Sequence, residues 1–201
     1  MTSTSVNAIE EAKYELLEQD NAFELRRYAP QILVETVVEG NFKEAGNRAF
    51  GLLFNYISGA NQAQSKIAMT APVSQDASAA QGEKIAMTAP VGQDLAADGS
   101  WRVSFLVPSL YTRETVPQPT DSRVYLREVP AQEVAVVRYS GTWNESNYDS
   151  HLKSLRDWMQ LRGLEPAGEP RWARYDPPFK PWFLRRNEVL VPVTLIPAEP
   201  D

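Results

Sequence analysis

The chain shows two hydrophobic patterns along its length, one typical of strands and one typical of helices. Strand-like runs of β-branched or alternating apolar residues lie at 14–19, 23–28, 31–40, 101–107, 124–129, 132–140, 171–175 and 188–195. In the fourth run, alternate residues share one face of the strand, namely Trp101, Val103, Phe105 and Val107. The short steps at Ala29–Pro30 and Pro130–Ala131 predict the turns of two hairpins.

Two other stretches repeat apolar residues every three or four positions, which predicts amphipathic helices. The first begins at Phe42, after the capping residue Asn41, and ends at Ser58–Gly59. Its apolar positions are Phe42, Ala45, Ala49, Phe50, Leu53, Phe54 and Ile57. The second covers 144–162 and stops at Gly163, with an apolar stripe of Tyr148, Leu152, Leu155 and Met159.

A shift of 101 residues aligns two halves of the chain without a gap. Residues 23–44 then lie on 124–145, so that Arg26 meets Arg127 and Gly40 meets Gly141. Two such units predict an α+β domain with a strongly curved antiparallel sheet or barrel and a helix on each side. We expect a flexible tail at 1–12, a single domain at 13–196 and a second tail at 197–201. The two halves of the domain would cover about 13–108 and 122–196.

Composition narrows the functional classes. The 201 residues carry a net charge of −6, which argues against a nucleic-acid partner. The chain has no cysteine, so disulfides, thiolate zinc sites and a cysteine nucleophile are excluded. No apolar run is long enough to span a membrane, and no signal peptide is visible, so we expect a cytoplasmic protein. A single histidine and no Gly-rich phosphate loop favour a binding protein over an enzyme.

An octapeptide, KIAMTAPV, occurs twice, at 66–73 and 84–91. Each copy is a strand-like run that ends in Ala-Pro, and proline in that place suits a strand end or an edge strand. The two copies could pair as a hairpin around 78–82.

The run YDPPFKPWFLRRNEVLV at 175–191 closely resembles the C-terminal signature of the SOUL haem-binding family. KIAMTAPV resembles the Met-Thr-x-Pro-Val segment of that family, and 56–61 resembles its helix-to-loop transition. The resemblance covers roughly 13–195, and the duplicated octapeptide looks like a bacterial form. It implies a distorted eight-stranded antiparallel β-barrel flanked by two long helices. It also implies that haem b or a porphyrin binds in a hydrophobic pocket beside the first helix.

The resemblance assigns pocket roles to several residues. Phe50, Leu53 and Phe54 match its apolar floor, and Lys180 matches a basic residue proposed to meet a propionate. Asn47 and Asn55 stand where the family has basic residues. Arg185 and Arg186 could add cations at the rim of the pocket. Alternatively, Arg185 to Glu188 form a turn or salt bridge that anchors the last strand, and Asp176 accepts backbone hydrogen bonds in a rigid turn.

Three residues are candidate ligands of the haem iron: Met69, Met87 and His151. The alternative is that the methionines pack in the core and that His151 is a surface or packing residue of its helix. The resulting hypothesis is a non-enzymatic carrier, buffer or sensor of a tetrapyrrole. The alternatives are a binding module for another apolar small molecule, and an enzyme that acts on haem, for example by removing iron.

Overall fold

The structure is a computed structural model, and it describes residues 9–63, 82–96 and 98–195. Within these residues the helices are α1 (Phe42–Ile57), α2 (Glu145–Leu161) and the short 3₁₀ helix η1 (Trp182–Leu184). The strands are β1 (Glu10–Glu11), β2 (Tyr14–Asp20), β3 (Phe23–Tyr28), β4 (Gln31–Val38), β5 (Asn61–Gln62), β6 (Thr88–Ala89), β7 (Val91–Leu95), β8 (Trp101–Leu106), β9 (Gln118–Pro119), β10 (Val124–Val129), β11 (Gln132–Tyr139), β12 (Leu164–Pro166), β13 (Arg171–Arg174) and β14 (Asn187–Leu195).

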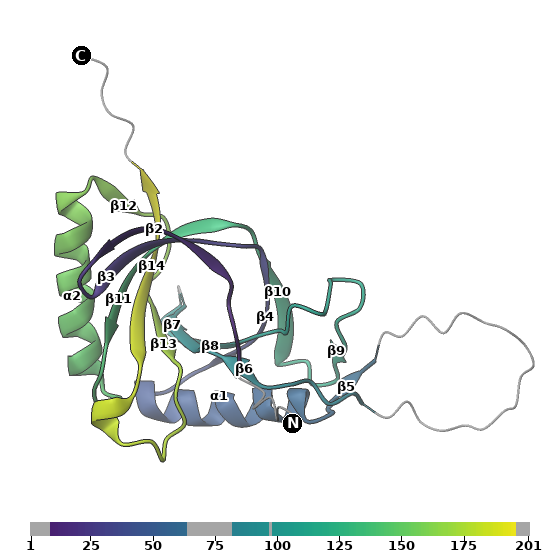
Figure 1. Cartoon of the computed structure of the whole chain (residues 1–201). Coiled ribbons are helices and arrows are strands. Elements are labelled where there is room, and N and C mark those ends of the chain that lie inside the picture. Colours follow the sequence, from purple (N-terminus) through teal and green to yellow (C-terminus); the bar gives the residue numbers. More distant parts are fainter. Residues whose placement is uncertain (1–8, 64–81, 97, 196–201) are drawn as a thin grey trace, which may run out of the picture.

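The main sheet is antiparallel and curls into a half-barrel, with both helices on its outer face (Figure 1). In the described part of the chain it has ten strands, in the order β10-β4-β8-β7-β13-β14-β11-β3-β2 with β12 beside β14. Helix α1 packs on β4, β8 and β10, whereas α2 packs on β11, β12 and β14. The predicted α+β class is confirmed. All eight predicted strand runs belong to this sheet, seven of them between β10 and β3 and the eighth as β2 at its edge, whereas β7 and β12 were not predicted.

Strand register reveals the predicted two-fold repeat directly. In the pair β3–β11, Leu25 lies opposite Ala135, and in the pair β4–β10, Val34 lies opposite Leu126. The second pair is the first one shifted by 101 residues, with the two halves exchanged. Strands β7 and β13 pair with each other at the centre of the sheet. The pseudo-two-fold axis therefore passes between β7 and β13.

Both hairpins predicted at the proline steps are wrong. Strand β3 pairs with β2 and β11, and β4 pairs with β10 and β8, so β3 and β4 are not partners. Likewise, β10 pairs with β4 while β11 pairs with β3 and β14. A two-residue hairpin needs residues that accept a positive φ, and neither Ala-Pro nor Pro-Ala supplies them. The chain instead crosses at these steps from one half of the curled sheet to the other.

Capping residues fix where both long helices begin. The side chain of Asn41 accepts a hydrogen bond from the Glu44 N–H at 3.0 Å, and that of Asn144 accepts one from the Asn147 N–H at 2.8 Å. The predicted helix ends thus agree with the structure to within a residue. The predicted face of β8 is also confirmed, because Val103, Phe105 and Val107 pack in the core beneath α1. None of the described helices is long and apolar enough to cross a membrane.

Part of the segment 1–12, which we expected to be a flexible tail, forms a strand. Strand β1, at Glu10–Glu11, pairs in parallel with β6 of the second octapeptide copy. The segment then crosses the open side of the half-barrel, where the Ala29 N–H donates to the Lys13 carbonyl at 3.2 Å. Residues 1–8 and the first octapeptide copy, 66–73, lie outside the described residues. The predicted pairing of the two copies therefore stays a prediction.

Candidate ligand-binding site

The outer face of α1 carries two exposed aromatic side chains. The buried stripe of this helix runs through Ala45, Ala49 and Leu53, so Phe50 and Phe54 lie outside it. They are 37% and 46% exposed, and their rings stack at a centroid distance of 6.0 Å. Phe50 also meets the edge of Phe105 in the core at 5.3 Å. The pair is thus held in place from below while its upper surface faces solvent.

The other predicted residues of this helix have different positions. Leu53 is 0% exposed and belongs to the core beneath α1, so it supports the aromatic pair and does not reach the surface. Asn47 and Asn55 are exposed on α1. The helix therefore brings Phe50, Phe54 and the two amides to its solvent side, and it places Leu53 in the core.

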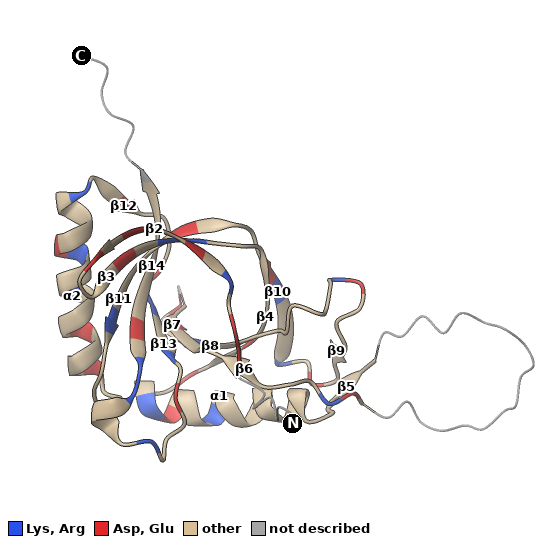
Figure 2. Ribbon diagram, viewed as in Figure 1, with Lys and Arg blue, Asp and Glu red and all other residues tan. Residues whose placement is uncertain are grey.

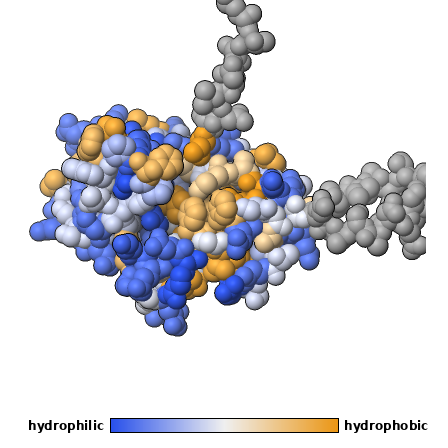
Figure 3. Space-filling view, turned by 90° about the horizontal axis from the view of Figure 1, so that it is seen from below, coloured by the Kyte–Doolittle hydropathy of each residue, from blue (hydrophilic) through white to orange (hydrophobic). Residues whose placement is uncertain are grey.

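The second octapeptide copy runs beside the C-terminal end of α1. The Ile85 N–H donates to the Ile57 carbonyl at 2.8 Å, and the Ile85 side chain is buried in the core beneath α1. Two residues further on, Met87 is 40% exposed. Figure 3 shows the molecule from the side of α1, with apolar side chains gathered in the middle of this face and hydrophilic ones around them. Such a patch on a folded protein is typical of an interaction site.

A cation lies on the same stripe of α1 as the aromatic pair. Lys43 precedes Asn47 by four residues and Phe50 by seven, spacings that place all three on one side of a helix. Lys43 is exposed and forms no ion pair with a described residue. Helical periodicity could have identified it from the sequence. Arg48, on the neighbouring stripe, donates to the Glu39 carbonyl.

The predicted cations near the C-terminus make contacts within their own loop and, in the case of Arg186, with carboxylates of β1 and β14. Lys180 pairs with Asp176 at 2.6 Å, and Arg185 donates to the carbonyls of Lys180 and Pro178 at 2.7 and 2.6 Å. Arg186 pairs with Glu188 at 2.9 Å, at the start of β14. The alternative interpretation for Arg185 to Glu188, a turn or salt bridge at the start of the last strand, agrees with these contacts. Their role in ligand binding stays a prediction.

Asp176 organises this loop as its sequence suggested. Its carboxylate accepts a hydrogen bond from the Arg186 N–H at 2.5 Å as well as the one from Lys180. Burial alone would raise the pKa of Asp176, but these two donors outweigh it and hold the pKa below its ordinary value. The guanidinium of Arg185 lies over the ring of Trp143 at 4.4 Å, which ties the loop to the start of α2. Arg185 is thus held beside the start of α2, while Lys180 and Arg186 are each paired with carboxylates.

The candidate iron ligands are dispersed. His151 lies on α2, its ring stacked on Tyr139 at 3.8 Å and its Nδ1 at 2.7 Å from the Asn147 carbonyl. Met87 lies near the end of α1, and Met69 lies outside the described residues. Within those residues, His, Asp and Glu side chains form no group of three or more that could hold a metal ion.

Sequence reasoning missed a largely buried cation at the N-terminal end of α1. Arg174 on β13 donates to the Gln93 side chain at 3.2 Å and lies over the rings of Trp143 and Trp172. A Cβ added to Gly46 of α1 would lie 3.4 Å from its guanidinium. Burial lowers the pKa of Arg174 to about 10. The position of Arg174 inside the strand-like run 171–175 was the available signal, but the sequence could not show which helix covers this residue.

Comparison with known proteins identifies the family. The family model described as SOUL heme-binding protein matches residues 9–81 and 75–192, and each matched segment contains one copy of KIAMTAPV. Heme-binding protein 1 of Xenopus tropicalis is 30% identical over 169 residues, which cover 84% of this chain and 82% of that protein. Heme-binding protein 2 of Homo sapiens is 25% identical over 179 residues, covering 85% and 81%. The chain belongs to the SOUL heme-binding protein family.

Solved structures with the same fold are more distant in sequence. The C-terminal domain of EcmrR superposes with a TM-score of 0.61 at 12% identity, covering 91% of this chain and 99% of that domain. A hydrolase from Listeria innocua superposes with a TM-score of 0.53 at 13% identity, covering 89% and 94%. At these identities the likeness concerns the fold alone.

Proposed function

We propose that this protein binds haem or a related tetrapyrrole against the outer face of α1, with Phe50 and Phe54 as the apolar floor. The ligand would be carried, buffered or sensed without breaking substrate bonds. The single observation that carries the proposal is the exposure of two stacked phenylalanines, 37% and 46%, on a helix that is otherwise amphipathic. Family membership supports the choice of ligand.

The pseudo-symmetric partner helix shows that this exposure is not required by the fold. Helix α2 covers the other half of the sheet, and its exposed positions include Lys153, Arg156, Asp157 and Gln160. Figure 2 shows charged residues along the whole of α2, whereas on α1 they are concentrated in the N-terminal half. Since a polar outer face serves the same packing role on α2, the aromatic face of α1 has another use.

The chemistry of the face suits a flat apolar guest with an acidic edge. Aromatic rings pack well against a planar macrocycle, and each buried square ångström of apolar surface contributes about 25 cal/mol. Lys43 and Asn47 offer a charge and an amide to a propionate, seven and three residues before Phe50 on the same stripe. Lys180, Arg185 and Arg186 are already engaged within their loop, so we assign them a secondary role. Met87 offers a soft thioether for the iron, and we leave His151 outside the site.

Titration of the protein with haemin tests the proposal. We expect a saturable Soret shift at one equivalent. The double variant Phe50→Ser/Phe54→Ser should bind at least about tenfold more weakly, since it loses two aromatic contacts. Leu161→Ser is the matched control, because Leu161 is 84% exposed on α2. Leu161→Ser should retain its stability within about 0.5 kcal/mol, as surface substitutions usually do. The double variant should lose more than that because Phe50 packs on Phe105, so its fold is checked by circular dichroism before the titration.

Each other outcome has a defined meaning. Equal weakening by the α1 and α2 variants, or none by either, would rule out the face of α1 as the site. A lack of saturation would favour a different apolar ligand. Gradual loss of the Soret band with release of metal-free porphyrin would favour an enzyme that removes iron. A changed ligand-field spectrum in Met87→Leu, together with an unchanged one in His151→Ala, would assign the iron ligand to the octapeptide.

A further inference from the structure

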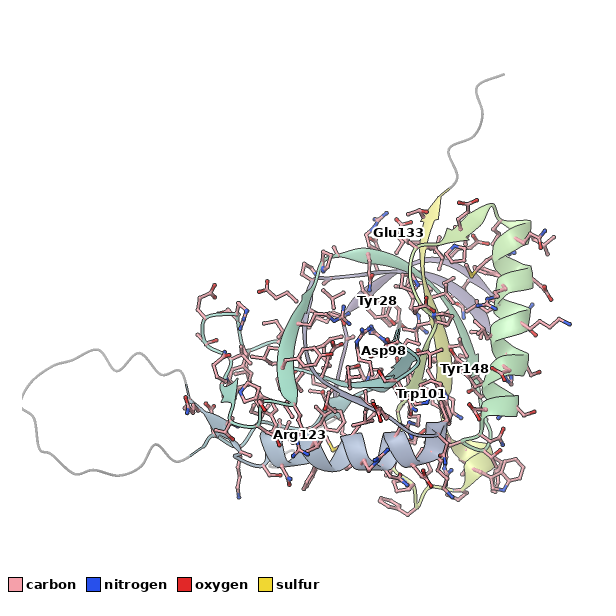
Figure 4. The ribbon with its side chains drawn as sticks, turned by 180° about the vertical axis from the view of Figure 1, so that it is seen from behind. Tyr28, Asp98, Trp101, Arg123, Glu133 and Tyr148 are labelled. Carbon is pink, nitrogen blue, oxygen red and sulfur yellow. The ribbon has the colours of Figure 1, made fainter. Side chains whose placement is uncertain are left out.

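The inner face of the curled sheet encloses a cavity, on the side opposite the two helices. Tyr28 projects into the ring that the sheet forms (Figure 4). The cavity has a volume of about 50 Å³, which is room for about four water molecules. It adjoins a larger recess of about 510 Å³ at the open side of the half-barrel, and Ala12, Gln31 and Leu106 line both spaces. The two spaces are therefore neighbours, a narrow inner one and a wide outer one, separated by these shared residues.

The wide part of this site is mostly apolar. Its apolar lining consists of Ala12, Ala29, Pro30, Ile32, Leu106, Val107, Pro108, Val129 and Pro130. Its charged residues include Glu10 and Lys13, which belong to the N-terminal segment that crosses the open side of the half-barrel, and Glu128, near the end of β10. Further in, Leu33, Leu106, Val134 and Leu190 line the narrow part. An apolar chain could therefore lie in contact with side chains along the whole path.

Charged side chains lie on the same inner face of the sheet, beyond the apolar residues, and we call them the charged floor of the cavity. Strand alternation puts Glu35 two residues below Leu33 on β4, and Arg102 four residues below Leu106 on β8. Arg127 makes two hydrogen bonds to Glu35, at 2.8 and 2.7 Å, and Arg102 pairs with Asp94 at 3.0 Å. Arg171 lies beyond these pairs, with Asp94 as its carboxylate neighbour at 3.5 Å. Among these buried and half-buried side chains, three arginines thus face two carboxylates.

Arg171 is the charged member of this floor that lines the cavity itself. Its Nε and the Oδ1 of Asp94 are both buried without a hydrogen-bond partner among the described residues. Gly92 leaves room for the Arg171 side chain, since a Cβ there would lie 2.9 Å from its Cδ and 2.6 Å from the Ser104 Oγ. Glu169 also lines the cavity, but it is exposed to solvent, which weakens its interaction with Arg171. The inner end of the cavity therefore offers a donor and a net positive charge.

We propose that this cavity binds a small amphipathic carboxylic acid, with the carboxylate on Arg171 and Ser104 and the apolar tail in the outer recess. The inner volume suits a carboxylate, and the outer volume suits a chain of several carbons. The ligand's carboxylate would give the Arg171 guanidinium a close, charge-assisted hydrogen bond, whereas Asp94 lies 3.5 Å away. This site is independent of the aromatic face of α1, because it lies on the other face of the sheet.

Three probes with one tail and different head groups test the proposal: octanoate, octylamine and 1-octanol. Calorimetry should show saturable binding of octanoate at one equivalent and much weaker binding of the other two. Two-dimensional amide NMR should place the octanoate-induced shifts at Gly92, Ser104 and Ala173. Arg171→Gln should weaken octanoate binding at least about tenfold, and Asp94→Asn should strengthen it, since it removes the competing carboxylate. Arg156→Gln on α2 is the control with the same loss of charge.

Octylamine or 1-octanol binding as tightly as octanoate would overturn the assignment of the head group. The absence of saturable octanoate binding, or shifts confined to α1, would overturn the site. If Arg171→Gln does not fold by circular dichroism, Asp94→Asn and Leu106→Phe decide, because the first changes the charge of the floor and the second narrows the passage. Phe50→Ser/Phe54→Ser should bind octanoate like the wild type, which separates this result from the haem titration.

Discussion

The two halves of this chain share strand register, helix placement and helix-capping hydrogen bonds. Equivalent side chains nevertheless differ in how far they are exposed to solvent. Arg26 on β3 and Arg127 on β10 correspond under the two-fold repeat. The Arg26 side chain is 0% exposed and the Arg127 side chain is 36% exposed. The difference follows from β2, which pairs with β3 and has no counterpart beyond β10. The ion pair of Arg127 is thus partly exposed to solvent, whereas the added strand β2 buries the corresponding ion pair of Arg26.

A second asymmetry separates the outer faces of the helices. Helix α1 exposes the stacked pair Phe50 and Phe54 in its second half, whereas α2 exposes mainly charged and amide side chains and one apolar residue, Leu161, at its last position. Both helices bury one stripe against the sheet, so the fold constrains the inner faces alike and leaves the outer faces free. Symmetric positions that differ in this way indicate where one half has acquired a role that the other half lacks.

The largest expected effect concerns the sealed arginine. Arg26 binds Glu188 at 2.8 Å and Glu24 at 2.6 Å, and its guanidinium lies over Tyr14 of β2 at 4.3 Å. Arg26→Met leaves Glu24 largely buried without a cation and removes one of the two arginines that pair with the buried Glu188, so the free energy of unfolding should fall by about 3–5 kcal/mol. Arg127→Met should cost only about 1–3 kcal/mol, since Arg102 remains 3.8 Å from Glu35. Urea unfolding measures both, and equal losses would contradict the role assigned to β2.

The same buried cluster should make the free energy of unfolding depend on pH. This effect should be smaller than that of Arg26→Met, because it arises from one carboxyl group, that of Glu188. Burial would raise the pKa of Glu188, but Arg26, Arg186 and Tyr175 outweigh burial and hold the pKa below the ordinary 4.5. This carboxylate therefore stabilises the fold at pH values above the ordinary Glu pKa, and the contribution disappears as pH falls through the lowered value. Glu188→Gln should be less stable at pH 7 and should lose less stability on acidification. Parallel pH profiles of wild type and variant would argue against this linkage.

The smallest expected effect concerns the helix caps, which are the same in the two halves of the repeat. Asn41 and Asn144 cap their helices with the same hydrogen bond. Asn41→Ala and Asn144→Ala should each lower the free energy of unfolding by about 1 kcal/mol. Thermal unfolding of the two variants should give similar shifts. A large difference between them would show that one helix start is supported by other contacts.

The sequence allowed the elements to be predicted well and their pairing poorly. Helix starts at Phe42 and near Asn144 follow from local capping and periodicity, and most strand limits follow from local alternation. Pairing depends on which distant segments meet, and the steps at Ala29–Pro30 and Pro130–Ala131 have the length of hairpin turns although they act as crossovers. The 101-residue shift indicated which positions are equivalent but not how they pair, since repeats with and without exchanged strands have the same shift.

The candidate site shows the same division. Phe50 and Phe54 were identified from the helix pattern together with the family signature, but periodicity assigned them to the apolar stripe, and their exposure became visible only in the folded structure. Lys180, Arg185 and Arg186 were expected at the rim because of their charge. Their hydrogen bonds to loop carbonyls and to Asp176 and Glu188 depend on a three-dimensional turn that charge alone does not specify. Arg171 and Asp94 are distant in sequence and meet only across β7 and β13.

The crossed strands have a consequence for the origin of the domain. Neither half can complete its own sheet, because β3 needs β11 and β4 needs β10. A chain of half this length would carry the same unsatisfied edges, and an identical second molecule would satisfy them in the same register. The present architecture is thus that of two intertwined subunits joined into one polypeptide, the closed two-fold arrangement that isologous homodimers adopt. Once the subunits were joined, their equivalent surfaces were free to diverge.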